Sequence, residues 1–320
     1  MRYPLSMSAD ANREGFRILR NEPALFPMEL LWRWSFGLGL LALTFLAYSH
    51  LRQFVLLTDA DEQALSGQNP FAVAEIAANL IAPMLPLLLR TCAQVFSMAA
   101  VLWIITAALG RGIITRVIVR RLAQDYGVAI AADAPHWVSF AVLQLGRVLM
   151  LLILVIGYFV GVFIAGLINA AANVLVVATV VFCSLTLASV VWSYVNWVLS
   201  LAPIFVARDA LPPLDALVEA IAFIRRHYPR LTSIALWNST LRGVAATAIS
   251  LASIFTVALS TALPPWAVTV LLALETLAYL VVSDIFLLAR LGAYASVALR
   301  ERILSAEPPP SPDRSGTAVR

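Results

Sequence analysis

The chain has 320 residues, of which 61% are hydrophobic and only 12% are charged. Soluble globular proteins contain about 45–50% apolar and about 25% charged residues, so this composition excludes an ordinary soluble protein. It also excludes a disordered chain, a coiled coil and collagen. All 22 basic residues are Arg, which indicates a GC-rich genome. The sequence therefore predicts an all-α polytopic membrane protein.

Six apolar stretches are long enough to cross a bilayer, which requires about 20 residues of helix because every backbone polar group must be satisfied internally. Residues 169–173 join the third stretch to the fourth, and Pro264 and Pro265 separate the fifth from the sixth, so both pairs are predicted to be helical hairpins. We expect residues 1–304 to form one membrane domain and residues 305–320 to form a disordered Pro-rich tail. The predicted spans are 34–57, 86–109, 148–168, 174–201, 236–263 and 266–288.

The arginines are distributed unevenly between the two sides of the predicted membrane. Twenty of the 22 lie on one side or near it, and only Arg52 and Arg90 belong to the other side. The positive-inside rule then places both termini in the cytoplasm, and we expect the membrane to be the bacterial inner membrane. The outer loop is acidic at residues 59–62 and continues into an apolar helix expected at 71–85 on the outer face.

Each predicted pair of spans follows a stretch with apolar residues at helical spacing and Arg on the other face. These stretches are residues 13–25, 137–147 and 217–227. Such basic amphipathic helices are typical of segments that lie in the headgroup plane. We therefore expect three units, each a cytoplasmic amphipathic helix plus a hairpin. Pro23 and Pro229 are each expected to end a short helix before the span begins.

The Arg side chains of the cytoplasmic segments are candidates for binding lipid headgroups. A guanidinium can hold two phosphate oxygens at once, and anionic lipid attracts basic segments to the membrane surface. The alternative is that these residues only set the topology. The candidates are Arg17, Arg20, Arg120, Arg121, Arg225 and Arg226.

Four ionisable residues lie inside predicted spans, where each costs about 2.5–3.5 kcal/mol on insertion scales. Arg242 and Asp284 fall at similar depths on antiparallel spans, and Arg90 and Glu275 both fall in the outer parts of theirs. We expect an Arg242–Asp284 pair and an Arg90–Glu275 pair that fix the helix register. The alternatives are a role in handling a substrate or proton, and snorkelling of the two Arg to the headgroups.

The fourth span carries four polar residues spaced by four, three and four positions, which places them on one face of a helix. Such a stripe more often holds helices together than lines a pathway. We expect packing against a neighbouring helix through Ser189, Ser193, Asn196 and Ser200.

The segment after the fourth span reads Ala202-Pro203-Ile-Phe-Val206-Ala-Arg208-Asp209, and the amphipathic stretch Leu214–Arg226 follows it. Together with the span count, this resembles a broad group of bacterial six-span proteins: the membrane domain of some glycerophosphodiester phosphodiesterases and Yip-like relatives. The resemblance implies an architecture and a link to lipid or membrane organisation. It implies no reaction, because these 320 residues contain neither a phosphodiesterase domain nor the paired acidic and His residues that such an enzyme needs.

No catalytic, metal-binding or phosphate-loop motif occurs, and Cys92 and Cys183 both lie inside predicted spans. We therefore expect no enzyme, no cofactor, no metal and no nucleic-acid partner. The first hypothesis is a membrane protein that binds anionic lipid or organises the membrane. The second is a small-solute or ion transporter that uses Arg90, Glu275 and Asp284. The third is an accessory subunit that binds a membrane-protein partner or a second copy of itself.

Overall fold

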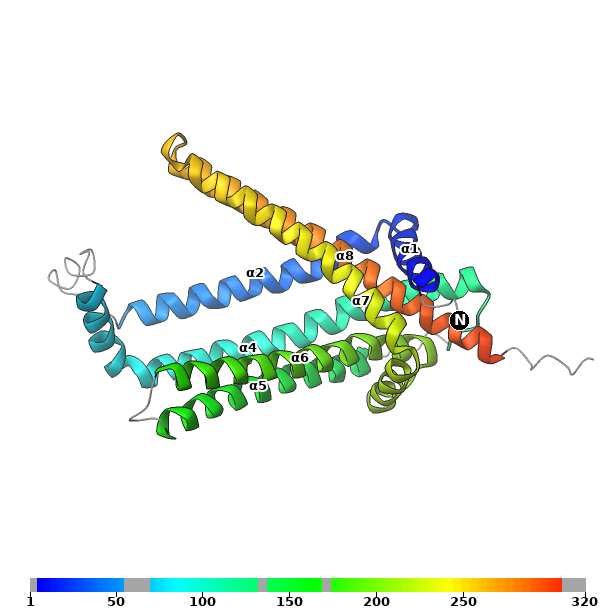
Figure 1. The fold of residues 1–320 in the computed structure, drawn as a ribbon, viewed down its shortest axis with the longest axis horizontal. Helices are drawn as coiled ribbons and strands as arrows, with labels where there is room; N and C mark the ends of the chain where they lie inside the picture. Colours follow the sequence, from blue (N-terminus) through cyan, green and yellow to red (C-terminus); the bar gives the residue numbers. More distant parts are fainter. Residues whose placement is uncertain (1–4, 55–69, 132–136, 169–173, 307–320) are drawn as a thin grey trace, which may run out of the picture. The chain divides into compact units, whose positions relative to one another are not determined.

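Figure 1 shows the computed structural model, which describes residues 5–54, 70–131, 137–168 and 174–306. Every described element is a helix. Six of the helices are long and apolar enough to cross a membrane, which confirms that part of the prediction. The elements are α1 (Leu5–Asn21), α2 (Leu25–Arg52), α4 (Pro70–Tyr126), α5 (Trp137–Ile168), α6 (Val174–Asp209), α7 (Pro213–Ala258), the 3₁₀ turn η1 (Leu259–Thr261) and α8 (Pro265–Ala306).

The helices extend well beyond the apolar stretches that predicted them. α4 continues to Tyr126, α6 to Asp209 and α8 to Ala306. Hydropathy marks the part of a helix that fits lipid, whereas the helix itself continues until its backbone is interrupted or capped. Residues 71–85, expected as a separate helix, are likewise part of α4, which contains Pro83 and Pro86 in its interior.

Only the first of the three expected amphipathic helices is a separate element. α1 ends at Asn21, just before Pro23, and α2 begins at Leu25, just after it, as predicted. At Pro229 the chain kinks instead of ending: His227 has the non-helical φ of −118° and ψ of 22°, and α7 then continues. Residues 137–147 are the first turns of α5, because no Pro lies between them and the span to interrupt the helix.

The chain groups into two compact units, although the sequence suggested one domain. One unit comprises residues 1–31 and 108–320, and the other comprises residues 32–107. The acidic loop at 59–62, the connection at 169–173 and the predicted tail beyond Ala306 lie outside the described residues.

The smaller unit is held together by aromatic packing between α2 and α4. The ring of Trp103 lies 5.7 Å from that of Trp32 and 5.0 Å from that of Phe36, both in edge-on geometry. One turn further along α2, Gly39 lies against Leu102. The absence of a side chain at Gly39 makes room for this leucine, so the two helices approach closely.

In the larger unit, α5 runs beside α6 and α7 runs beside α8, with η1 closing the second pair (Figure 1). α1 packs on α8, where a Cβ added to Gly15 would lie 2.1 Å from the carbonyl oxygen of Ala289. Ala11 and Ile18, on the same face of α1, are buried. The apolar face of α1, expected on the membrane surface, is therefore covered by protein at these positions.

The core of the larger unit lies at the Arg-rich ends of its helices. Phe205 of α6 and Phe223 of α7 meet there edge-on at 5.4 Å. By contrast, side chains in the middle of the apolar stretches point outward, for example Phe182, which is 69% exposed. This division is the one expected where lipid covers the spans and protein covers their ends. The largest fully buried side chains include Ile114, Ile118, Leu122, Phe140, Leu201, Ile204, Leu231 and Tyr294.

Candidate functional site

Two of the candidate headgroup residues connect α1 to the end of α4. Arg17 Nη2 donates to Asp125 Oδ2 at 3.0 Å and also pairs with Glu14. Arg121 Nε lies 3.5 Å from Glu22 Oε1. The hydrogen bond with Glu14 raises the pKa of Arg17. Both guanidinium groups therefore have carboxylate partners within the protein.

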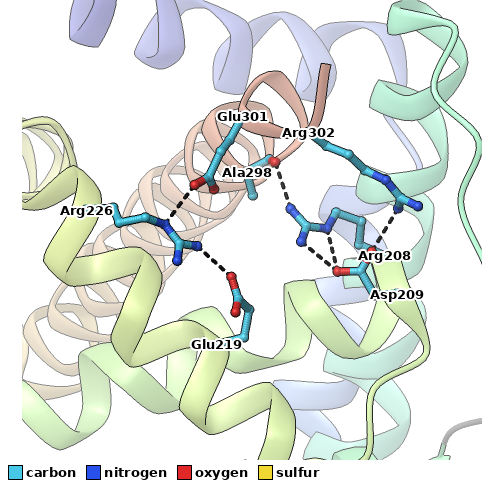
Figure 2. A network of polar contacts seen from close by, with 7 residues as sticks. All are labelled: Arg208, Asp209, Glu219, Arg226, Ala298, Glu301 and Arg302. Atoms are coloured by element: carbon cyan, nitrogen blue, oxygen red, sulfur yellow. Dashed lines mark hydrogen bonds and ion pairs between the residues drawn. The ribbon is translucent and has the colours of Figure 1, made fainter. Parts of the chain in front are cut away.

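A second connection joins α7 to α8 (Figure 2). Arg226 Nη2 donates to Glu219 Oε1 at 2.6 Å, and its Nε donates to Glu301 Oε1 at 2.8 Å. The preceding residue, Arg225, is exposed and has no carboxylate partner among the described residues. Two consecutive arginines that are indistinguishable by sequence thus have different surroundings.

A third connection joins α6 to α8 through residues that were not among the predicted site residues. Arg208 Nη1 donates to the carbonyl oxygen of Ala298 at 2.8 Å, and its Nη2 lies 2.6 Å from Asp209 Oδ2 (Figure 2). Asp209 Oδ1 accepts from Arg302 Nη1 at 2.8 Å. The Arg208 guanidinium also lies 4.9 Å from the ring centre of Phe205. The signal in the sequence was that opposite charges are adjacent at Arg208-Asp209 and at Arg300-Glu301-Arg302.

The six candidate headgroup residues therefore differ in their partners. Arg17, Arg121 and Arg226 are engaged by carboxylates, and of these Arg17 and Arg226 remain exposed. Arg20 and Arg225 are exposed and have no carboxylate partner among the described residues, and Arg120 is exposed and makes an interaction of its own. Charge counts could not separate the carboxylate-bound arginines from the others, because the separation depends on which helix faces which.

The predicted intramembrane pairs have different surroundings. Arg242 of α7 reaches α8, where its Nε donates to Ser283 Oγ at 3.1 Å. The neighbouring Asp284 is only 4% exposed. The structure thus places Arg242 of α7 next to the part of α8 that carries Ser283 and Asp284, as expected. An ion pair between Arg242 and Asp284 stays a prediction.

Glu275 is bonded to hydroxyl groups of the adjacent helix. Its Oε2 accepts from Ser253 Oγ at 2.7 Å, and its Oε1 accepts from Thr256 Oγ1 at 2.5 Å. Arg90 is exposed and belongs to the other compact unit, so its pairing with Glu275 stays a prediction. Sequence reasoning missed the two hydroxyl groups, which lie three residues apart on one face of α7.

The polar stripe of α6 divides into two halves. Ser189 and Ser193 are exposed, and their hydroxyls donate to backbone carbonyls one turn earlier in the same helix. Toward the other end, Asn196 and Ser200 line a groove of about 310 Å³. Of the four residues only Ser200 is buried, and Ser193 also reaches the groove, so packing of the whole stripe against a neighbouring helix stays a prediction. The complete lining is Ser193, Tyr194, Asn196, Trp197, Ser200, Ala235, Arg290 and Tyr294.

Within the described part of the chain, no group of three His, Cys, Asp or Glu side chains is placed to hold a metal ion. Both cysteines are unpaired thiols. No protein-family model, curated protein or solved structure matches the chain significantly. The six-span resemblance described above therefore stays an expectation.

Proposed function

We propose that this chain is a multi-pass membrane protein that binds anionic lipid on its Arg-rich side, which faces the cytoplasm with both termini. The observation that carries the proposal is the exposure of Arg20 and Arg225, neither of which has a carboxylate partner among the described residues. An Arg near an anionic membrane surface contributes about 1 kcal/mol of attraction. The carboxylate-bound arginines contribute to folding instead.

The position of these arginines supports a lipid role. Arg225 lies just before the kink at His227 and the span that follows it. Its neighbour Tyr228 is 56% exposed and Trp237 is 53% exposed. Tyr and Trp are enriched at the level of the headgroups, where the ring is apolar and the polar tip reaches water. An exposed cation three residues from an exposed Tyr, on a helix that continues to an exposed Trp, is the surface expected to contact anionic headgroups.

Arg225 and Arg226 provide a matched pair of variants. The protein, reconstituted into vesicles of equal phosphatidylglycerol and phosphatidylcholine, is tested with spin-labelled lipids of each class. The fraction of immobilised label gives the preference for anionic lipid. We expect the preference to fall in Arg225→Gln, and to fall further when Arg20→Gln is added. We expect Arg226→Gln to lower the thermal midpoint while leaving the preference near that of the wild type.

Two results would contradict the proposal. One is a wild-type protein that immobilises both lipid classes equally. The other is an equal loss of preference in Arg225→Gln and Arg226→Gln, because the charge count alone would then explain it. Recovery of a stoichiometric protein partner or a transported solute, with no lipid preference, would favour the accessory-subunit or transporter hypothesis instead.

A further inference from the structure

Glu275 is the only charged residue along a long stretch of the α7–α8 pair. Residues 243–283 contain no other Asp, Glu, Arg, Lys or His, and Tyr279, one turn further along α8, is the only other titratable side chain among them. The spans predicted at 148–168 and 174–201, on the helices beside this pair, contain no charged residue. At the level of Glu275, the four spans of the larger unit therefore provide a carboxyl group and no cation.

The carboxyl group lies deep in the predicted span. Glu275 follows Trp266 by nine residues and precedes Leu288 by thirteen, which at 1.5 Å per residue corresponds to roughly 14 and 20 Å of helix. Leu274 beside it is 56% exposed, so lipid covers this surface when the helices span a membrane. An ionised carboxylate is costly in such surroundings, and an acidic group there becomes neutral instead.

The oxygen atoms around Ser253 are satisfied best with a proton on Glu275. Ser253 Oγ lies 2.7 Å from Glu275 Oε2 and 3.0 Å from the carbonyl oxygen of Ile249. A carbonyl oxygen and an ionised carboxylate only accept, and a hydroxyl has one proton to donate. Thr269 and Thr276 of α8 donate to the carbonyl four residues earlier, so the bond from Ser253 to Ile249 is the usual one for a hydroxyl in these spans. The contact with Oε2 then needs a proton from the carboxyl group itself.

The second carboxyl oxygen completes a chain of hydrogen bonds. Thr256 is 6% exposed, and its Oγ1 donates to Glu275 Oε1 at 2.5 Å. In a carboxylic acid this oxygen remains an acceptor. Thr256 thus donates to Glu275, Glu275 to Ser253 and Ser253 to Ile249, with each proton used once. The separations are those of O–H···O hydrogen bonds, so protons and not a metal ion fit between these oxygen atoms.

We propose that Glu275 binds a proton inside the membrane, as a neutral carboxylic acid held by Ser253 and Thr256, and that it is a site of modification by hydrophobic carbodiimides. The inference goes beyond the lipid proposal and does not depend on it, because it concerns a residue that the lipid surface does not use. It competes with the Arg90–Glu275 ion pair expected from the sequence, in which the carboxylate would be ionised.

The modification requires the proton that the proposal assigns to Glu275. The carboxyl group gives its proton to a nitrogen of the carbodiimide, and its oxygen bonds to the central carbon of the reagent. The resulting O-acylisourea then transfers the acyl group to nitrogen and ends as a stable N-acylurea. No group leaves, so the residue gains the full mass of one carbodiimide. A carboxylate that is ionised must first take up a proton.

The test is the rate of labelling by dicyclohexylcarbodiimide in the full-length protein, reconstituted into phosphatidylcholine vesicles at neutral pH. Peptide mass spectrometry identifies each labelled residue. We expect Glu275 to be labelled, and its rate to stay constant when the pH is lowered by one unit. Glu219, whose carboxylate accepts from Arg226, is the internal reference for an ionised group. The labelling rate of an ionised carboxylate should rise about tenfold for the same change, because its protonated fraction does.

Substitutions separate the proton site from an ion pair. Glu275→Gln should abolish labelling at this position without lowering the thermal midpoint, because an amide donates and accepts as the neutral acid does. Glu219→Gln is the matched control and should leave the labelling of Glu275 in place. Arg90→Gln should leave the labelling rate of Glu275 unchanged. Labelling is also compared in sodium chloride and potassium chloride at equal concentration, where we expect equal rates.

Several outcomes overturn the proposal. Labelling of Glu275 that accelerates about tenfold per pH unit on acidification shows an ionised carboxylate. A faster rate in Arg90→Gln, or a clearly lower thermal midpoint in Glu275→Gln, shows that an ionic partner held the group. Selective protection by sodium assigns the site to a metal cation. Glu275→Gln should leave the spin-label preference for anionic lipid unchanged, so failure here is distinguishable from failure of the lipid proposal.

Discussion

Arg208 and Arg302 both contact Asp209, but their surroundings predict unequal contributions to stability. Arg208 is 9% exposed and also donates to the backbone carbonyl of Ala298, which is completely buried. The side chain of Arg302 is 41% exposed. Changing Arg208 to Gln removes the charged donor that reaches this buried carbonyl and removes the closer cation from Asp209. Changing Arg302 to Gln removes a partner of Asp209 that is screened by solvent.

The expected magnitudes follow from these contacts. The hydrogen bond from the charged Arg208 to the Ala298 carbonyl contributes about 1.5–3 kcal/mol. Removing one partner of a buried ion pair costs about 3–5 kcal/mol, but Asp209 retains Arg302 and is itself 21% exposed, which reduces that loss. We expect Arg208→Gln to cost about 3 kcal/mol. An exposed pair contributes about 0.2–1 kcal/mol, so Arg302→Gln should cost less than about 1 kcal/mol.

Thermal unfolding in a single detergent measures the difference between the two variants. Each kcal/mol lowers the midpoint by about 2–4 °C in domains of about 150–250 residues. Arg208→Gln should therefore lower the midpoint by roughly 6–12 °C, and Arg302→Gln by a few degrees at most. Equal shifts in the two variants would refute the reasoning, because burial and the bond to Ala298 would then contribute nothing.

Two further substitutions test how the helices pack. Gly15→Ala should loosen α1 from α8, because its Cβ would lie 2.1 Å from the Ala289 carbonyl oxygen. Overpacking of this kind costs about 1–3 kcal/mol. Faster trypsin cleavage within α1 would show that the helix has loosened. Thr256→Val keeps the side-chain shape but removes a donor to Glu275, so the α7–α8 pair should lose about 1–2 kcal/mol, measured by thermal unfolding in detergent.

Each of these variants has a control within the chain. Gly146→Ala adds the same methyl group where no atom lies within 4 Å, so it should not destabilise. Thr276→Val removes a hydroxyl that donates only to the carbonyl oxygen of Leu272 in its own helix. A control that destabilises as much as its partner variant would show that the general cost of the substitution, and not the interhelical contact, is being measured.

The six spans could be predicted because lipid imposes a length and a composition on each helix. The ends of the helices could not be predicted, because they depend on local interruptions such as Pro, whose effect varies with the surrounding contacts. Pro23 separates two helices, whereas Pro229 only kinks α7 after His227. Both follow an Arg by three residues, so the motif alone does not distinguish a stop from a kink. The surrounding contacts decide which occurs.

The roles of the arginines were the least predictable feature, since they depend on contacts between distant segments. Arg225 and Arg226 are adjacent, yet only Arg226 reaches a carboxylate on α8, at Glu301. Helical geometry explains this, because consecutive residues point about 100° apart and cannot both face the same neighbour. A count of charges on one side of the membrane therefore predicts topology but overestimates the number of arginines available to lipid.

The polar stripe of α6 shows what spacing can and cannot predict. Intervals of four and three correctly place its members on one helix face, but the partner of that face changes along the helix. Ser189 is exposed and satisfied by its own backbone, whereas Ser200 is buried and accepts a hydrogen bond from Arg147. Tyr294, which completes the groove, lies almost one hundred residues later on α8. No pattern within α6 could have identified it, because its role arises only where α6 and α8 meet.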